Sequence, residues 1–534
     1  MRRFSLVIPT LRRAETLEYA LATLLAQPDD DIQIVVQNNG ADPATRDVVE
    51  RAADPRVEHF STPDTVPMAE NWERALGNAD GEYVTFIGDD DGLLPDACRV
   101  ARAVLDDVET DVLSWEPFSY FWPSYWDERR SNTLLARVSN GFRVRAVASL
   151  PLLRRCLAFQ AHYSKLPMVY NSFVSRSLIE RARARHGRYF VGGLPDVTSG
   201  VMNATYSDTF LKSDRTLSIA GLSGQSIGTR LWRADGGSPS EIAREVPRLA
   251  GHSASRTPSL EETIAAELEL LAREVVGERH DVTFDERGAV RSLAASINES
   301  PSRYEETRAV ILARMRSLGM GDDDVYIPPP LERPPIPELG THELGGGETL
   351  HVVDGEKLGL ESVADAARAA MQLVAPPATM TVSSAIPYLD GVPVVSAEPL
   401  SFARNEDGAL ALVSGWAEPE PWGAWSVERE SVLRVRLSPP QEWQRVRLAL
   451  RYRTVQLDRK RELAVAIGGA APARRKLDKR GHEGELVLDV APEMLDGPVD
   501  LRIVNLNSRA PRELGIGEDQ RPLGIGVEAI RIIR

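Results

Sequence analysis

The sequence predicts an α/β domain with a mainly parallel sheet, followed by a helical extension and a C-terminal antiparallel β-sandwich. Over the first hundred residues, apolar strand-like segments alternate with amphipathic helical segments. Near-continuous apolar strands in such an alternation indicate a parallel sheet that is covered on both faces. From about residue 394 the pattern changes to short alternating strands between Pro, Gly and Asp turns, which is typical of a sandwich.

Each element follows from the spacing of its apolar residues. The segment "FSLVIPT" predicts a buried strand, and the helix after it places Leu17, Leu21, Leu24 and Leu25 on one face. Residues 145–188 are expected to be mainly helical. The other predicted strands, with the loops that follow some of them, are 31–40, 56–62, 82–88, 110–126 and 215–228. The other predicted helices are 43–53, 68–79, 93–107 and the end of 190–207.

The pattern divides the chain into five parts. We expect an α/β domain over 1–234, a charged helical extension over 235–320 and a Pro/Gly-rich linker over 321–348. A small helical connector over 349–393 and the sandwich over 394–534 follow. Within the extension, Ser259 and Glu262 have the spacing of a helix capping box.

Composition excludes several classes of function. The net charge of -15 argues against nonspecific nucleic-acid binding, which needs a basic surface. Two cysteines, Cys98 and Cys156, cannot build a disulfide framework or a four-ligand zinc site, and they fit a cytoplasmic setting. The N-terminal apolar run is too short for a signal peptide, and no run of 18 apolar residues occurs. We therefore expect at most peripheral membrane contact.

Three polar loops leave strands of the predicted sheet at one edge. They are "PTLRR", "QNNGAD" and "GDDDG", and ligands of such sheets bind beyond the carboxyl ends of the strands. The last loop sets Asp89, Asp90 and Asp91 side by side. A solvated turn would explain this run, and so would a calcium loop, although the EF-hand spacing fails. The convergence of the three loops favours a ligand site.

Four segments together resemble the GT-A fold of family 2 glycosyltransferases. They are "FSLVIPTLRRAETLEYALATLLAQ", "IQIVVQNNG", "MAENWERALGNADGEYVTFIGDDDGLLP" and "GGLPDVTSG", in the order and approximate spacing of that family. The match covers about the first 230 residues. It implies a nucleotide-diphosphate sugar donor and a divalent cation, Mn²⁺ or Mg²⁺, held by carboxylates.

The resemblance assigns roles around the donor. It implies that Asp91 is a metal ligand, that Asp89 is a ligand or a ribose contact, and that Asp90 contacts the sugar. Alternation at the end of a strand would point Asp89 and Asp91 one way and Asp90 the other. The remaining donor-binding residues that the resemblance implies are Pro9, Thr10, Arg13, Asn38, Asn39 and Asn71.

Two positions depart from the family pattern. Arg12 replaces the asparagine of the first motif, and we interpret it as a solvated side chain. The loop "QNNG" offers Gln37, Asn38 and Asn39 where many members carry an aspartate. Amides both donate and accept, so they remain able to recognise a base, but the identity of that base stays open.

Asp196 in "GGLPDVTSG" occupies the place of the family's catalytic base. An inverting transfer needs such a group to take the proton of the acceptor hydroxyl. The alternative is that Asp196 caps a helix that starts at Val197. Gly192 and Gly193 would let the backbone approach a substrate closely.

Aromatic and basic residues suggest further contacts, each with a structural alternative. Trp115 and Trp122 could stack on an acceptor or fill the core. The five arginines of "RSLIERARARHGR" could contact an anionic lipid, although a solvated helix face is the favoured interpretation. Whether His252 is a metal ligand stays open.

The C-terminal sandwich resembles an accessory domain of bacterial polysaccharide-biosynthesis glycosyltransferases. Trp416, Trp422 and Trp425 could form a carbohydrate platform, with Asp519 and Arg521 as polar contacts beside it. The same residues could equally serve the core and an internal ion pair.

The sequence thus predicts a metal-dependent, inverting glycosyltransferase. It would move a sugar from a nucleotide-diphosphate donor to a saccharide or lipid-linked glycan, in polysaccharide or cell-surface glycan synthesis. An inactive carbohydrate-binding scaffold on the same fold is the alternative. A nucleotidyltransferase is disfavoured because "PTLRRAETL" contains no glycine for a phosphate loop.

Overall fold

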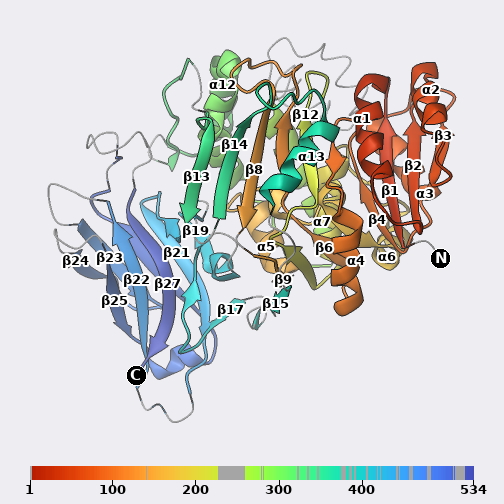
Figure 1. Ribbon diagram of the computed structural model, residues 1–534. Helices are drawn as coiled ribbons and strands as arrows, with labels where there is room; N and C mark the ends of the chain where they lie inside the picture. The colour runs from red at the N-terminus through yellow and green to blue at the C-terminus, as the bar shows by residue number, and fades with distance from the viewer. Residues whose placement is uncertain are drawn as a thin grey trace. The chain divides into compact units, whose positions relative to one another are not determined.

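The computed structural model divides the chain into two compact units (Figure 1). One consists of Met1–Ser149 with Tyr163–Ser383, and the other of Leu150–His162 with Ser384–Arg534. The described residues are 3–139, 141–226, 259–277, 279–280, 282–321, 324–332, 336–345, 348–374, 380–383, 388–389, 392–403, 407–417, 419–420, 422–440, 443, 445–455, 461–477, 483–508, 510–511 and 523–534. His252, Asp519 and Arg521 lie outside them, as does the expected boundary at 234.

The first unit contains a nine-stranded sheet in the order β15-β9-β11-β6-β10-β4-β1-β2-β3. The strands β1, β2, β3 and β4 are parallel to one another, as the alternation predicts. Their bounds, with the rest of the sheet, are β1 Phe4–Thr10, β2 Ile32–Asn38, β3 Val57–Ser61, β4 Tyr83–Phe86, β6 Val112–Ser114, β9 Arg143–Ala148, β10 Ser172–Ser175, β11 Thr209–Ser213 and β15 Thr381–Ser383.

The strand β10 is antiparallel to both of its neighbours, β4 and β6. It lies inside residues 145–188, where we expected mainly helix, so that expectation is wrong at this segment. The strand has four buried residues, "SFVS", directly before a helix. A segment this short shows no alternation of its own.

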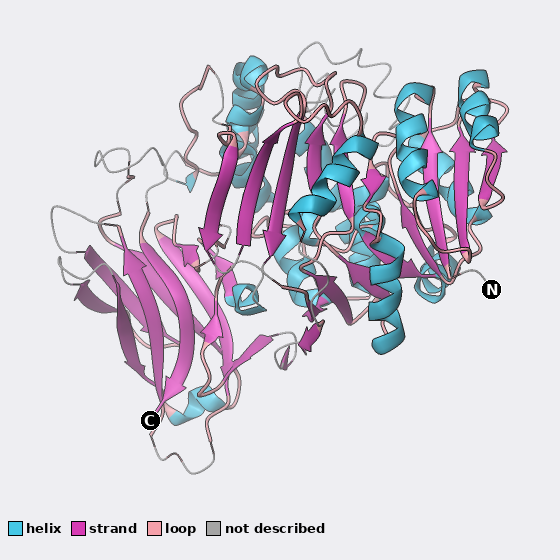
Figure 2. Cartoon of the chain, in the orientation of Figure 1, coloured by secondary structure: helices cyan, strands magenta, loops and turns pink. Residues whose placement is uncertain are grey.

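Helices connect and cover the strands of this sheet (Figure 2). Leu17, Leu21 and Leu24 of α1 pack in one cluster with Phe4 and Ile34 of the strands, as their common face predicts. The helices are α1 Ala14–Leu25, α2 Pro43–Ala52, α3 Met68–Asn78, α4 Ala97–Asp107, α6 Arg176–His186 and α7 Pro195–Tyr206. Two 3₁₀ turns, η1 Tyr163–Lys165 and η2 Val169–Asn171, precede β10.

A second sheet of the same unit has the order β13-β14-β8-β7-β12-β5. Its strands are β5 Gly92–Leu93, β7 Phe118–Phe121, β8 Thr133–Ser139, β12 Ser218–Leu222, β13 Gly340–Gly345 and β14 Glu348–Asp354. Helix α13, Val363–Leu373, packs on it through Val363, Ala366 and Ala370. The expected linker therefore ends in a strand, and the expected helical connector begins with one.

The described part of the expected charged extension, which begins at residue 259, is mainly helical. Its helices are α10 Leu260–Leu271, α11 Glu286–Ala295 and α12 Tyr304–Ser317, with a π-helical segment at Ala272–Val276 and 3₁₀ turns at Ile297–Glu299 and Pro301–Arg303. The predicted capping box is confirmed, because Ser259 accepts from the Glu262 backbone N–H and Glu262 accepts from that of Ser259. Among the described helices of the chain, none has the length and apolar composition to cross a membrane.

The second unit is a sandwich of two largely antiparallel sheets with one shared core. Leu433 and Leu501 of one sheet pack with Leu450 and Ile530 of the other. One sheet contains β16 Tyr388–Leu389, β17 Val392–Val395, β19 Leu412–Ser414, β21 Glu430–Leu437, β23 Arg461–Ile467, β24 Ala473–Leu477 and β26 Pro498–Asn505. The other contains β18 Leu400–Ser401, β20 Ala424–Trp425, β22 Arg447–Thr454, β25 Glu483–Asp489 and β27 Ile525–Ile533. Helix α5, Ser149–Leu157, belongs mostly to this unit.

Candidate active site

The three aspartates lie in a turn after β4, and the end of β1 holds the first of them. Asp89 accepts a hydrogen bond of 2.7 Å from Thr10 Oγ1, and it forms an ion pair with Arg13 Nη1 at 3.0 Å. Thr10 is the last residue of β1, and parallel pairing of β1 with β4 brings the two ends together. Thr10 and Arg13 thus meet Asp89, as the convergence of the loops predicts.

Asp90 faces the segment that follows β12. Its Oδ2 accepts a hydrogen bond of 2.6 Å from Ser223 Oγ, and its backbone oxygen accepts one of 2.9 Å from the indole nitrogen of Trp122. Arg13 also donates to the backbone oxygen of Gln225 at 2.5 Å. The segment after β12 is therefore bonded to both the aspartate turn and the first loop.

Asp91 is held by backbone N–H groups. One carboxylate oxygen accepts from Gly88 at 2.9 Å and the other from Gly221 at 2.7 Å. The three carboxylates have three different sets of partners and lie in a turn. The expected alternation at the end of a strand is therefore wrong.

Charge accumulates at this turn. Burial, together with the repulsion of the neighbouring aspartates, raises the pKa of Asp91 to about 8 and that of Asp90 to about 6. Arg13 offsets part of this repulsion at Asp90. A bound cation would favour the ionised forms of these carboxylates.

The aspartate turn fits a divalent cation that uses only one or two protein carboxylates as ligands. The described part of the chain holds no group of three or more His, Cys, Asp or Glu side chains arranged around a metal. Mg²⁺ and similar ions in nucleotide sites, however, use one or two carboxylates and take the remaining oxygens from substrate phosphates and water. Asp91 fits this use better than Asp89, because Arg13 already neutralises Asp89.

The amides of the second loop serve the loop itself. Asn38 donates to the Asp42 backbone oxygen and accepts from its N–H, and Asn39 does the same with Val66. Asn38 is fully buried, and Asn39 is 3 % exposed. The polar atoms of these two side chains therefore hold the loop, and a contact with a base stays a prediction that would compete with these bonds.

The other predicted donor residues lie nearby in the fold. Pro9 is buried at the end of β1, opposite Gln37 in the register with β2. Asn71 on α3 is 3 % exposed, and its side-chain oxygen has no hydrogen-bond partner among the described residues. A buried acceptor without a donor is costly, which fits a ligand contact there. Arg12 is exposed, as expected for a solvated side chain.

Asp196 lies in the first turn of α7 and is not its cap. The N-cap residue is Leu194, which makes no side-chain capping bond. Within residues 191–200, Asp196 alone is not fully buried. Burial raises the pKa of its carboxyl group, while nearby backbone N–H groups act in the opposite sense. Asp196 is therefore not the N-cap residue of α7, although its carboxylate accepts from N–H groups of the first turn of that helix.

Tyr170 links Asp196 to the aspartate turn. It lies on η2, whose Val169 accepts from Thr85 of β4 at 3.1 Å and donates to Ser199 of α7 at 3.1 Å. Burial raises the pKa of Tyr170, and the charges of Asp91, Asp196, Asp90 and Asp89 raise it further. Its hydroxyl thus lies within the field of all four carboxylates. We missed this residue because "MVYNS" carries no motif.

The predicted acceptor tryptophans serve the protein interior. Trp115 is fully buried and donates to Ser218 Oγ at 2.7 Å, so the structure contradicts an acceptor contact. Trp122 is 6 % exposed and supports the aspartate turn through its bond to Asp90. Tyr19, beside Trp122, and Trp126 are the exposed aromatic residues of this region.

The three predicted tryptophans of the sandwich comprise one core residue and two partly exposed residues. Trp416 is buried and donates to the Val432 backbone oxygen, so it belongs to the core. Trp422 and Trp425 are partly exposed and contact each other edge to face, with 5.2 Å between ring centroids. The guanidinium of Arg453 lies 3.9 Å from the centroid of Trp422, which covers one face of that ring.

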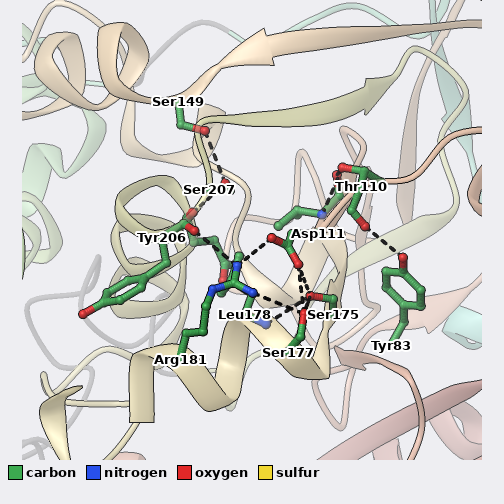
Figure 3. Close-up of polar contacts among 12 residues, drawn as sticks. Tyr83, Thr110, Asp111, Ser149, Ser175, Ser177, Leu178, Arg181, Tyr206 and Ser207 are labelled. Atoms are coloured by element: carbon green, nitrogen blue, oxygen red, sulfur yellow. Dashed lines mark hydrogen bonds and ion pairs between the residues drawn. The ribbon is translucent and has the colours of Figure 1, made fainter. Parts of the chain in front are cut away.

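Three arginines of helix α6 contact other parts of the protein, and Figure 3 shows the contacts of Arg181. Arg181 contacts Asp111 at 2.6 Å, and Asp111 also accepts from Ser175 and Ser177. Arg176 donates to the backbone oxygens of Ala79 and Gly81, and Arg183 pairs with Glu73 at 3.0 Å. These contacts support a structural role over lipid binding.

Comparison with known proteins finds similarity over the N-terminal part of the chain. The model of the family "Glycosyl transferase family 2" matches residues 5–163. Over 100 residues the chain is 32% identical to the GalNAc(5)-diNAcBac-PP-undecaprenol beta-1,3-glucosyltransferase of Campylobacter jejuni subsp. jejuni serotype O:2. That match covers 18% of this chain and 32% of the relative, so it spans about a third of the relative's length.

Solved structures with similarity include S. aureus TarS and a mannosyltransferase. S. aureus TarS 1-349 in complex with UDP-GlcNAc is 15% identical, covers 60% of this chain and 92% of its own, and has a TM-score of 0.33. Mannosyltransferase PcManGT from Pyrobaculum calidifontis, in complex with GDP-Man and Mn²⁺, is 16% identical. It covers 60% of this chain and 83% of its own, with a TM-score of 0.31.

Proposed function

Because residues 5–163 match the model of the family "Glycosyl transferase family 2", we propose that this chain catalyses a metal-dependent, inverting transfer of a sugar. The donor is a nucleotide-diphosphate sugar, and the acceptor is a hydroxyl of a saccharide or a lipid-linked glycan. One observation carries the proposal. Tyr170 lies within the field of both Asp91 and Asp196, and its neighbour Val169 is bonded to Thr85 of β4 and to Ser199 of α7. This supports a single site that contains the aspartate turn and the carboxylate of Asp196.

The aspartate turn is the donor side of this site. Asp91 would hold Mn²⁺ or Mg²⁺, which supplies Lewis-acid stabilisation of the diphosphate charge when bound. Arg13 and Thr10 keep Asp89 in place, and Ser223 does so for Asp90. The buried side-chain oxygen of Asn71 can accept a hydrogen bond from the nucleotide sugar. The base of the nucleotide stays open, because the amides of the second loop are occupied.

Asp196 is the acceptor side. In the proposed step, its carboxylate takes the proton of the acceptor hydroxyl as that oxygen attacks the anomeric carbon. The bond from this carbon to the diphosphate oxygen breaks, and its electron pair leaves with the nucleotide. Attack on the face opposite the leaving group inverts the anomeric centre. A raised pKa makes Asp196 a stronger base than an ordinary aspartate.

The relative from Campylobacter supports a glycan acceptor. Its name specifies an undecaprenol-diphosphate-linked glycan as its acceptor and a glucosyl transfer. For this chain we propose the same chemical class of acceptor, which would place the reaction in polysaccharide or cell-surface glycan synthesis. A lipid-linked acceptor would bring the chain to a membrane surface as a peripheral protein.

Turnover of a panel of UDP-, GDP- and dTDP-sugars, with Mn²⁺ or Mg²⁺, tests the proposal. We expect Asp91→Ala and Asp196→Ala each to reduce nucleotide release by about 100-fold or more. Asp107→Ala, an exposed acid on α4, is the matched control and should keep full turnover. If both site variants retain wild-type turnover, the proposed site is wrong. No turnover in the wild-type chain, with glycan binding by calorimetry, would favour a carbohydrate-binding scaffold.

A further inference from the structure

Glu267 is a fully buried carboxylate that contacts the loop of Asp196. It lies on α10, in the helical extension. Its Oε2 accepts from the Gly193 backbone N–H at 3.0 Å, and its Oε1 accepts from that of Leu194 at 3.0 Å. Oε1 also accepts from Thr198 Oγ1 at 2.8 Å. All three donors lie within three residues of Asp196.

The loop is shaped around this carboxylate. A Cβ atom at Gly192 would lie 1.8 Å from Glu267 Oε1 and 2.6 Å from Thr198 Oγ1. Glycine is therefore required at this position because Glu267 fills the space where a side chain would begin. The expectation that Gly192 admits a substrate is wrong for this reason.

A second carboxylate fixes the same segment upstream. Glu73 Oε2, on α3, accepts from the backbone N–H groups of Tyr189 and Phe190, both at 2.9 Å. The segment before α7 is thus bonded to α3 at one end and to α10 at the other. Glu267 is the anchor next to Asp196.

We propose that Glu267 is a positioning residue, which holds the loop at Gly193 and Leu194 so that the Asp196 carboxylate faces the acceptor. This inference rests on the proposed function and names a residue outside the 5–163 domain that the reaction needs. The helical extension then contributes to the site through one side chain. Misplacement of a reacting group by about 1 Å costs about 100-fold in rate, so a small shift of the loop suffices.

The choice of a carboxylate supports this role. Burial raises the pKa of Glu267, and the charge of Asp196 raises it further, while the bonds from Gly193, Leu194 and Thr198 lower it. A residue that only filled space would avoid this repulsion. A carboxylate, with two acceptor oxygens and no N–H, is the side chain that satisfies two adjacent backbone donors at once.

The test compares Glu267→Gln with Glu262→Gln. Glutamine keeps the size of Glu267 but places an NH₂ group against a backbone N–H. Glu262→Gln weakens the capping box of the same helix and leaves the loop contacts in place. The probe is the nucleotide sugar of the panel that the wild-type chain hydrolyses fastest. Hydrogen exchange at the Gly193 and Leu194 amides reports on the loop.

We expect Glu267→Gln to lower kcat by about 10- to 100-fold, with donor KM unchanged within about twofold and faster exchange at the two amides. Glu262→Gln should keep kcat. If the two variants lower kcat equally, or Glu267→Gln keeps kcat, the positioning role is wrong while the proposed function stands. If Asp196→Ala itself keeps wild-type turnover, the assignment of Asp196 as the base in the proposed function fails, and the positioning of that base fails with it.

Discussion

At the scale of single residues, Arg13 is the cation that balances the aspartate turn. Removing one partner of a buried ion pair leaves the other charge uncompensated, at a cost of about 3 kcal/mol. We expect Arg13→Ala to lower the free energy of unfolding by about that amount, because Asp89 is only 4 % exposed. Arg12→Ala replaces the neighbouring exposed arginine and should change the free energy of unfolding by less than about 0.5 kcal/mol. Urea denaturation of both variants measures the difference.

The raised pKa of Asp196 predicts a pH dependence of the reaction. A base works as the carboxylate, and burial raises the pKa above the ordinary value of about 4 for aspartate. The value of kcat/KM should therefore fall as pH decreases through this raised pKa. Protons compete with the cation for Asp91, which adds a second limb to the pH profile at a position that depends on cation concentration. The pH profile of kcat/KM is therefore measured at a saturating cation concentration. An acid limb at or below about pH 4 would contradict the assignment.

The sequence located the aspartate turn and Asp196, because motifs with a fixed order carry them. It did not locate Tyr170 or Glu267, whose roles depend on which elements pack together. It also could not show that Asn38 and Asn39 are occupied. An amide in a polar loop has the same pattern whether it bonds a ligand or, as here, the backbone of Asp42 and Val66.

At the scale of elements, we expect a glycine substitution in the loop before α7 and one in helix α3 to have different effects on stability. Gly192→Ala would place a Cβ against Glu267 and should destabilise the protein by about 2 kcal/mol. Gly77→Ala, in helix α3, meets no atom within 4 Å and should be neutral or stabilising by up to about 1 kcal/mol. Thermal unfolding of the two variants compares them. Equal transition temperatures would contradict the close approach of Glu267.

Element types were predicted best where the apolar pattern is long. The strands and helices before residue 107 appear at the expected places, and so does the Ser259 cap. The strand β13 was missed because Pro and Gly dominate the composition of the predicted linker, and β14 was missed because it falls in the segment that we expected to be a helical connector. The strand β14 pairs with β8, which lies about 200 residues earlier in the chain. His351, for example, is the register partner of Ala136. No local window contains such a partner.

At the scale of the whole molecule, the two units have separate cores that share no residue. Leu501→Ala removes a fully buried side chain from the sandwich core and should cost that unit about 3 kcal/mol. Leu506→Ala, at a position that is 41% exposed, is the matched control. Calorimetry should show two transitions, of which Leu501→Ala lowers one. A single transition, or an equal shift of both, would contradict separate cores.

Helix α5 is made long before the strands of its own unit. The ribosome releases Leu150–His162 more than two hundred residues ahead of Ser384, a delay of roughly 10 to 40 s at ordinary rates of synthesis. Leu152, Leu153 and Leu157 are buried in the finished protein, but the rest of their unit is absent during that interval. The nascent chain therefore presents the leucines of this helix to chaperones. A truncation that ends at Ser383 would leave this helix permanently in that state.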